Sequence, residues 1–342
     1  MNKRILIVNV NWVGDVLFST PFIRSVRQAH PGAYIACLLH PRCAEMLEGN
    51  PHLNEIIVYD EKGRHKGLIG KTMLIISLRN KRFDTAFLLH RSFTKALITY
   101  LAGIPSRIGY PTKNRGGILT KAVDMPVEEQ HKVEYFLNIA RAANIIPSDV
   151  SYEFAVGDAD RKAVKELLAK EGIGEKDPIV VLCPGGNWDP KRWPKENFAH
   201  LGDLLAEKTG VRIVISGAAK DASLAESIHA MMKSRPIITA GRTTLKQLGA
   251  LLERAKLVVA NDSGPMHIAV AVKAPTIALF GPTSPLLTGP YGKGNYHVMV
   301  GKASGKDPAC EVPCYDITCN ANTCMADICV ADVLSKAREK MN

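Results

Sequence analysis

The feature that most constrains this chain is a regular alternation between short aliphatic, β-branched runs and longer amphipathic segments. The runs are typical of buried strands, and the amphipathic segments are typical of helices. In the first half, the predicted strands are 5–10, 34–39, 55–59, 84–89 and 107–110, and the predicted helices are 16–27, 41–48, 71–79, 92–102 and 128–143. Because parallel strands are joined by right-handed crossovers through helices, this order predicts an α/β domain with a parallel sheet.

The same alternation starts again after a polar stretch rich in Asp and Gly. Its predicted strands are 179–183, 212–216, 236–239, 257–260 and 276–280, and its predicted helices are 160–171, 195–209, 221–233, 244–255 and 265–272. We therefore expect two Rossmann-like, doubly wound domains, 1–155 and 156–329, facing a central cleft. A last helix within 330–342 is expected to pack back on the first domain. Such sheets bind ligands at the carboxyl ends of their strands.

Composition excludes several classes of protein. With 342 residues, of which 46% are apolar, the chain can bury a large core and is not a disordered protein. No apolar run reaches the roughly 18 to 20 residues of a membrane span. Polar Asn9, Asn11 and Asp15 interrupt the first apolar run too early for a signal peptide. We expect a cytoplasmic protein with reduced thiols.

The basic charge is concentrated in one segment. Lys62 to Arg115 holds twelve basic residues and one acidic residue, a difference of +11 that equals the net charge of the whole chain. Any one of these side chains can be an ordinary solvated base, but the set indicates an anionic partner. Nucleic acid is not favoured, because the aromatic residues of the segment fall in apolar patterns typical of a core. An anionic saccharide or lipid headgroup ranks first.

Familiar cofactor and metal signatures are missing. Residues 65–72 nearly match a phosphate-binding P-loop but have His65 where the first glycine is required, and the first strand lacks the three spaced glycines of a dinucleotide site. Asp158 and Asp160 are better explained as a helix start than as metal ligands. The five last cysteines, Cys310, Cys314, Cys319, Cys324 and Cys329, lack the paired spacing of zinc or iron–sulfur ligands. We expect no metal, no cofactor and structural thiols.

Asp15 follows the first predicted strand, where an α/β sheet presents its ligand-binding groups. A carboxylate at this place serves as a general base or as the N-cap of the next helix. The two roles compete, since hydrogen bonds from backbone amides lower the basicity of a carboxylate. Spacing alone does not choose between them.

Three loops end strands of the second half. They are 184–194, with two glycines and the cations Lys191 and Arg192, 261–267, which opens a helix with Pro265 at its first turn, and 280–285. Backbone amides at such a helix start bind a diphosphate, Lys191 neutralises its charge, and Asp262 accepts hydrogen bonds from sugar hydroxyls. Each loop alone is also consistent with ordinary turns and caps. Together they predict a ligand site at one sheet edge.

Five segments together resemble one known family, glycosyltransferase family 9, the ADP-heptose:lipopolysaccharide heptosyltransferases, over nearly the whole chain. The segments are Trp12-Val13-Gly14-Asp15, Lys191-Arg192-Trp193-Pro194, Asn261-Asp262-Ser263-Gly264-Pro265-Met266-His267, Gly281-Pro282-Thr283-Ser284-Pro285, and Pro313-Cys314 with Cys324-Met325. The first loop is most similar to the type II enzymes, which add the second heptose. The resemblance implies the GT-B fold, an acceptor held by the amino-terminal domain, an ADP-sugar held by the carboxy-terminal domain, and inversion at the anomeric carbon.

The resemblance also implies roles for single residues. Asp15 would be the general base, and the donor would contact Lys191, Asp262, Ser263, Gly264, His267, Gly186, Asn187 and Thr283. Within the basic segment, the acceptor candidates are Arg64, Arg91, Lys95 and Arg107. The implied donor is ADP-L-glycero-D-manno-heptose, and the implied acceptor is the anionic inner core of lipopolysaccharide in a Gram-negative-type envelope, met at the cytoplasmic face of the inner membrane.

One departure from the family pattern leaves the donor sugar open. Residues 184–189 read Pro-Gly-Gly-Asn-Trp-Asp where type II sequences tend to carry Pro-Gly-Ala-Glu. Two alternatives therefore stand beside heptose transfer. One is a family 9 transferase for another nucleotide sugar or glycan, and the other is a non-catalytic binder of an anionic polymer.

Overall fold

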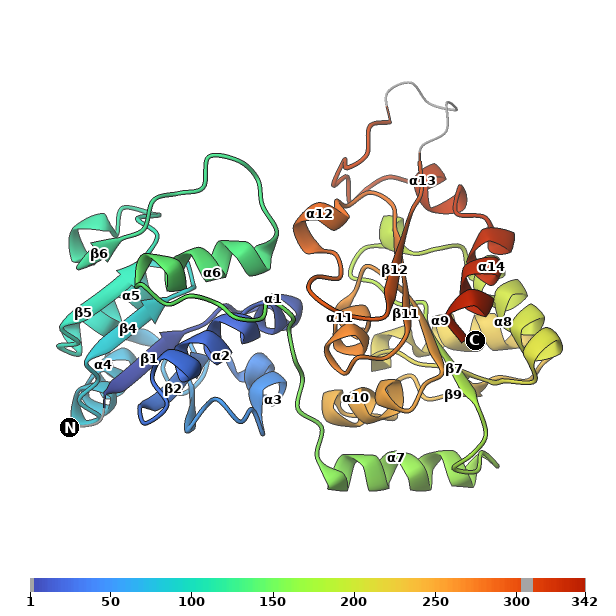
Figure 1. Cartoon of the computed structure of the whole chain (residues 1–342), viewed down its shortest axis with the longest axis horizontal. Helices are drawn as coiled ribbons and strands as arrows, with labels where there is room; N and C mark the ends of the chain where they lie inside the picture. The colour runs from blue at the N-terminus through green and yellow to red at the C-terminus, as the bar shows by residue number, and fades with distance from the viewer. Residues whose placement is uncertain (1–2, 303–309, 342) are drawn as a thin grey trace. The chain divides into compact units, whose positions relative to one another are not determined.

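The computed structural model describes residues 3–302 and 310–341, and the chain divides into two compact units, Met1–Tyr152 and Glu153–Asn342 (Figure 1). The boundary lies a few residues before the one expected from the sequence. No helix in the described ranges combines the length and the apolar character that crossing a bilayer requires.

The first unit is a six-stranded parallel sheet in the order β3-β2-β1-β4-β5-β6. Its strands are β1 (Arg4–Val8), β2 (Tyr34–Leu39), β3 (Glu55–Val58), β4 (Thr85–Leu88), β5 (Ser106–Gly109) and β6 (Lys121–Ala122). Its helices are α1 (Val13–Phe18), α2 (Thr20–Ala29), α3 (Ala44–Leu47), α4 (Gly67–Asn80), α5 (Phe93–Leu101) and α6 (Lys132–Ala142). The chain reverses its direction of winding between β1 and β4, which makes these two strands the switch point of the sheet.

Helices cover both faces of this sheet, which explains the nearly continuous apolar sequence of its strands. On one face, Leu6 and Val8 of β1 pack in a cluster with Leu74 and Leu78 of α4. On the other face, Phe22 of α2 packs edge-to-face on a β4 ring, with ring centroids 5.2 Å apart.

The second unit repeats the same winding, with sheet order β12-β11-β10-β7-β8-β9 and only parallel pairs. Its strands are β7 (Ile179–Cys183), β8 (Arg212–Ile215), β9 (Ile237–Ile238), β10 (Leu257–Asn261), β11 (Thr276–Phe280) and β12 (Tyr296–Val300). Its helices are α7 (Asp158–Lys170), α8 (Lys195–Thr209), α9 (Ala222–Met231), α10 (Leu245–Glu253), α11 (Gly264–Ala271), α12 (Pro285–Thr288), α13 (Thr323–Ala326) and α14 (Val330–Met341). The expected pair of doubly wound parallel sheets is confirmed, and β7 and β10 form the second switch point.

The structure differs from the sequence prediction at several elements. The helix expected at 16–27 is two helices, because the Ser19 hydroxyl donates to the carbonyl of Val16 at 2.6 Å and Pro21 opens a new first turn. Strands β6 and β12 were not expected: β6 has two residues, and β12 is half-exposed.

The last helix of the chain is α14. It packs on α8 and on β10 and β11, and it contributes Val333, Leu334, Ala337 and Met341 to the core of the second unit. Its apolar stripe is therefore already buried within its own unit. Its expected packing on the first domain stays a prediction.

The segment before α14 lies close against the strand edge of its own unit. The Trp193 indole donates to the carbonyl of Ile328 at 2.9 Å, and the Asn322 amide donates to the carbonyl of Arg192 at 2.9 Å. A Cβ added at Gly301 would stand 1.6 Å from the carbonyl oxygen of Cys324. The approach of two backbones at this point therefore requires glycine.

We expect Gly301→Ala to lower the free energy of unfolding by about 1–3 kcal/mol, because the clash is with backbone that cannot rotate away. Gly117→Ala is the control, since a Cβ at Gly117 meets nothing within 4 Å. Urea unfolding followed by circular dichroism measures both. Equal stability of the two variants would contradict the close approach.

Candidate active site

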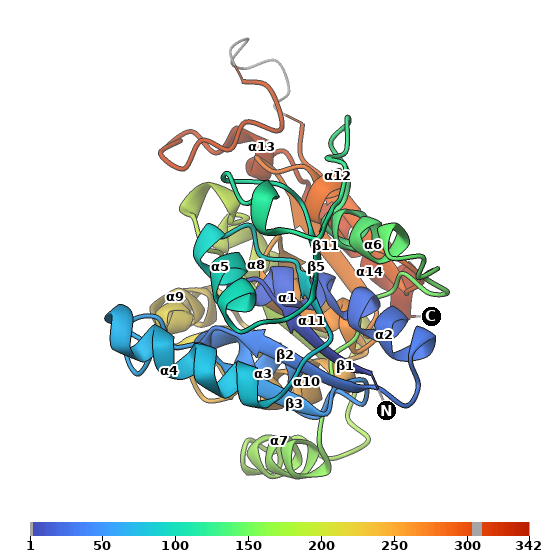
Figure 2. The same ribbon diagram turned by 90° about the vertical axis from the view of Figure 1, so that its left-hand side faces the viewer.

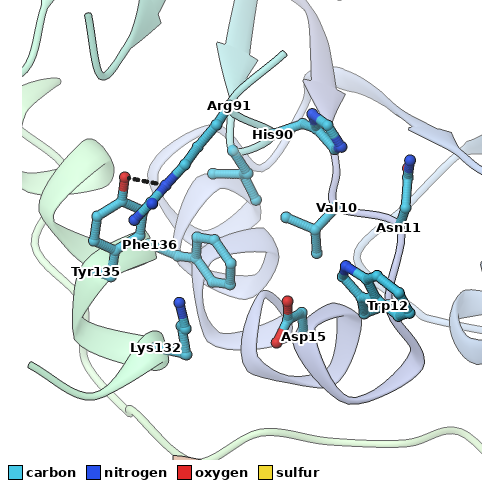
Figure 3. Close-up of a pocket in the computed structure, with 10 residues that line it drawn as sticks. Val10, Asn11, Trp12, Asp15, His90, Arg91, Lys132, Tyr135 and Phe136 are labelled. Carbon is cyan, nitrogen blue, oxygen red and sulfur yellow. Dashed lines mark hydrogen bonds between the residues drawn. The ribbon is translucent and has the colours of Figure 1, made fainter. Parts of the chain in front are cut away.

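A pocket lies at the switch point of the first sheet (Figure 3). Three segments line it: the loop after β1 with the start of α1, the loop after β4, and the start of α6. The lining residues are Val10, Asn11, Trp12, Asp15, Leu89, His90, Arg91, Lys132, Tyr135 and Phe136. This is the place where doubly wound sheets bind their ligands.

Asp15 lies in the first turn of α1, whose N-cap is Trp12. The carboxylate is therefore not the N-cap, which was the other role open to it. Burial raises the pKa of Asp15, while the cations Lys132 and Arg91 oppose that rise. A carboxyl group with a raised pKa is a better proton acceptor than an ordinary surface aspartate.

The two cations are positioned by α6. The Arg91 guanidinium donates to the Tyr135 hydroxyl at 3.0 Å and lies 4.8 Å from the centre of the same ring (Figure 3). Tyr135 in turn stacks on Tyr110 with centroids 4.3 Å apart. Lys132 comes from the first residue of α6 and points into the pocket beside Asp15. The site thus offers one base and two cations to an anionic ligand.

Of the four acceptor candidates, the structure brings Arg91 into this pocket. Lys95 is buried beside it, where its Nζ donates to Asn11 Oδ1 at 2.6 Å and burial lowers its pKa to about 8. Lys95 therefore orders the loop that carries Trp12. Arg64 is exposed in the loop before α4, away from the pocket lining.

Arg107 lies elsewhere, and its guanidinium donates to the carbonyls of Ile104 and Ile118. Arg115, another base of the same segment, is fully buried and donates to the carbonyls of Tyr110 and His90. Some of the bases in the basic segment therefore donate hydrogen bonds to backbone carbonyls and are not available to bind a ligand. Lys132 and Tyr135 were missed because they lie outside that segment. In the sequence, Lys132 and Tyr135 are indicated only by the start of a predicted helix near the carboxyl edge of the first sheet.

In the second unit, three loops meet at the carboxylate of Asp262, which is 5% exposed. Lys191 Nζ lies 2.5 Å from Asp262 Oδ2, and the Thr283 hydroxyl donates to the same oxygen at 2.7 Å. His267 Nε2 lies 3.9 Å from Asp262 Oδ1. The sequence-predicted residues Lys191, Asp262, His267 and Thr283 are thus brought together at the second switch point.

Asn261 cross-links the same loops. Its side chain accepts from the Trp193 amide at 3.1 Å and donates to the carbonyl of Pro184 at 2.7 Å. Ser263 is the N-cap of α11 but makes no side-chain cap bond, and Gly264 and Pro265 form the first turn. Pro265 has no N–H, so the N–H groups of Gly264 and Met266 are the ones that this helix start offers to an anion.

Gly186 and Asn187 lie in the loop after β7. The carbonyl of Gly186 accepts from Arg192 at 3.0 Å, and Asn187 Oδ1 accepts from Lys220 at 3.3 Å. The loop is thus bordered by two more cations. All eight cysteines are free thiols, and no group of His, Cys, Asp or Glu within the described ranges is arranged to hold a metal ion.

Comparison with known proteins shows that this chain is similar to many members of one family. The family model described as glycosyltransferase family 9 (heptosyltransferase) matches residues 72–315. The chain is 32% identical to lipopolysaccharide heptosyltransferase 2 of Salmonella typhimurium, over 84% of this chain and 85% of that protein. It is 31% identical to the enzyme of the same name from Escherichia coli K12, with coverage of 84% and 85%.

Solved structures agree. The structure of E. coli ADP-heptose lipopolysaccharide heptosyltransferase II superposes with a TM-score of 0.81 at 28% identity, covering 99% of this chain and 98% of that chain. A glycosyltransferase family 9 protein from Veillonella parvula superposes with a TM-score of 0.82 at 27% identity, covering 87% of each chain. With the two parallel sheets, these likenesses confirm the expected GT-B fold.

We expect Asp15→Asn to be more stable than the unchanged protein, by a margin that grows as pH rises. Because burial raises the pKa of Asp15, the folded chain holds a proton that the unfolded chain has released, so stability falls with rising pH through that window. Asparagine cannot ionise, which removes this loss.

Urea unfolding between pH 4 and pH 8 measures the margin. The control is Asp124→Asn, an exposed aspartate of the same unit. If the stability difference between Asp15→Asn and the unchanged protein were constant with pH, or equal to that of Asp124→Asn, burial would not raise the pKa of Asp15.

Proposed function

We infer that this chain, which belongs to glycosyltransferase family 9, transfers a heptose from ADP-L-glycero-D-manno-heptose to the inner core of lipopolysaccharide. It is a glycosyltransferase, so a non-catalytic polymer binder is not retained as an alternative. The observation that carries the assignment of its chemistry is Asp15, a half-buried carboxyl with a raised pKa at a sheet switch point beside two cations.

In this proposal the first unit holds the acceptor. Arg91 and Lys132 attract the anionic groups of the inner core and place a sugar hydroxyl at Asp15. Asp15 takes the proton of that hydroxyl as its oxygen attacks the anomeric carbon of the donor. The bond from that carbon to the diphosphate oxygen breaks, ADP leaves with the bonding electrons, and the configuration inverts.

The second unit would hold the donor. The amides that open α11 and the ammonium of Lys191 stabilise the charge that grows on the departing diphosphate, and this makes a metal ion unnecessary. Asp262 keeps Lys191 in place through their ion pair, and Thr283 keeps Asp262 in place. Ser263, Gly264 and His267 complete the donor contacts, with Gly186 and Asn187 across the loop after β7.

The location follows from the acceptor. Lipopolysaccharide precursors are glycolipids, so the proposal includes peripheral contact with the cytoplasmic face of the inner membrane. The anionic partner of the basic segment is then the glycolipid and its membrane, with no role for nucleic acid.

We expect Asp15→Asn to lower kcat by about 10²–10⁴-fold while leaving ADP binding unchanged, because Asp15 belongs to the acceptor unit. Transfer of heptose to a heptose-deficient core measures kcat, and calorimetric titration with ADP measures binding. Near-normal turnover of this variant would remove Asp15 from the mechanism.

We expect Lys191→Met, unlike Asp15→Asn, to weaken the binding of ADP. ADP at about 100 times its dissociation constant should raise the free energy of unfolding of the unchanged protein by about 2.7 kcal/mol, and much less for this variant. Lys162→Met, an exposed lysine of α7, is the control. Stronger stabilisation by UDP or GDP than by ADP would keep the fold but replace the donor.

A further inference from the structure

The outer face of α4 carries four large apolar side chains that the described part of the chain leaves uncovered. Leu68 is 82% exposed, Ile69 80%, Met73 52% and Ile76 51%. On a helix of 3.6 residues per turn these four fall within an arc of about 140°, so they form one stripe. The opposite side of α4 already buries Leu74 and Leu78 against the sheet. The outer stripe is therefore not needed for the core, and a contiguous apolar patch of this kind indicates an interaction site.

Helix α5 extends the patch. It lies beside α4, as Figure 2 shows, and its Tyr100 and Leu101 are also half-exposed. Arg79 of α4 donates to the carbonyl of Leu101 at 2.6 Å, which fixes the two helices together. We call Leu68, Ile69, Met73, Ile76, Tyr100 and Leu101 the α4 face.

Five bases lie next to the α4 face in the sequence, three just before α4 and two within it. They are Lys62, Arg64, Lys66, Lys71 and Arg79, and within the described ranges none of them forms an ion pair. The two acids that precede these bases are both bound by other groups of the protein. The Asp60 carboxylate accepts from the amides of Gly63 and Arg64, and Glu61 lies 3.9 Å from the buried ammonium of Lys95. The rim of the patch is thus positive, and α4 itself contains no acidic residue.

We propose that the α4 face docks this enzyme on the surface of an anionic phospholipid bilayer. The apolar side chains enter the boundary between headgroups and acyl chains, and the rim of bases meets the lipid phosphates. This inference rests on the proposed function, since it supplies the membrane contact that a glycolipid acceptor requires.

The position of α4 in the fold supports the same partner. The chain leaves the carboxyl end of β3 at Val58 and enters α4 at Gly67, so Leu68 and Ile69 lie toward the sheet edge where the Asp15 pocket opens. A bilayer docked at this end of α4 brings the sugars of an embedded glycolipid toward that edge.

A second copy of the chain is the weaker candidate for covering this face. A two-fold contact places the same patch on both sides, and the five bases of one copy would then face the five bases of the other. An anionic bilayer complements both the apolar stripe and the positive rim.

The test is flotation of the purified full chain with vesicles of phosphatidylethanolamine and phosphatidylglycerol, against vesicles of phosphatidylcholine. We expect binding to the anionic vesicles only, weakened at least tenfold by the double change Leu68→Asn and Ile69→Asn and weakened severalfold by Lys66→Gln with Lys71→Gln. The matched control is Val127→Asn with Ile146→Asn, which removes two apolar side chains of the same unit that are 102% and 89% exposed and lie outside the patch. Thermal unfolding confirms that each variant is folded.

Two activity measurements separate this inference from the proposed function. With a delipidated core oligosaccharide, the Leu68 and Ile69 variant should keep its turnover, and with acceptor embedded in vesicles its turnover should fall about tenfold. Failure to bind anionic vesicles, equal binding by the variant, or a shift of the unchanged protein to a dimer that the variant abolishes would each overturn the docking proposal. Absence of heptose transfer by the unchanged protein would overturn the function and leave the flotation result standing.

Discussion

Both sheets of this chain are parallel and are covered by helices on both faces, so their strands are apolar nearly throughout and their polar chemistry is confined to the edges. At the carboxyl edge the chain leaves each strand through a loop, and at the switch point two such loops diverge to opposite faces. The Asp15 pocket and the Asp262 cluster occupy this same place in the two units. The fold therefore determines the position of both sites, and the residues of the loops determine which ligands they bind.

The two sites use charge in opposite ways. In the first unit a carboxyl is kept basic by burial while two cations beside it limit the change in its pKa. In the second unit one oxygen of a buried carboxylate is held by both a lysine and a hydroxyl, and in the proposed mechanism this carboxylate supports other groups. In the proposed mechanism the same residue type thus serves as a proton acceptor in one unit and as an anchor in the other, because the neighbours differ.

The sequence predicted the parts of this architecture that depend on local pattern. Buried strands stand out as aliphatic runs, and loops with Gly, Asp and Pro directly after them stand out as ligand sites. What the sequence could not predict depends on long side chains and on distant packing. Arg107 and Arg115 look like members of a binding surface, yet their guanidinium groups hold backbone carbonyls. Lys132 reaches the Asp15 pocket only because α6 begins beside that pocket. The position of α14 depends on which other elements its apolar side chains can pack against, and these are α8, β10 and β11.

In the proposed mechanism, the ion pair between Lys191 and Asp262 affects how quickly the product ADP leaves. A diphosphate that draws Lys191 toward itself competes with a carboxylate 2.5 Å away, so part of the attraction is offset by the contact that is given up. When the spent nucleotide departs, Asp262 is beside the ammonium to take it back. In that mechanism the pair lowers the affinity for the product, and replacing Asp262 by a residue without a carboxylate would tighten nucleotide binding and slow product release.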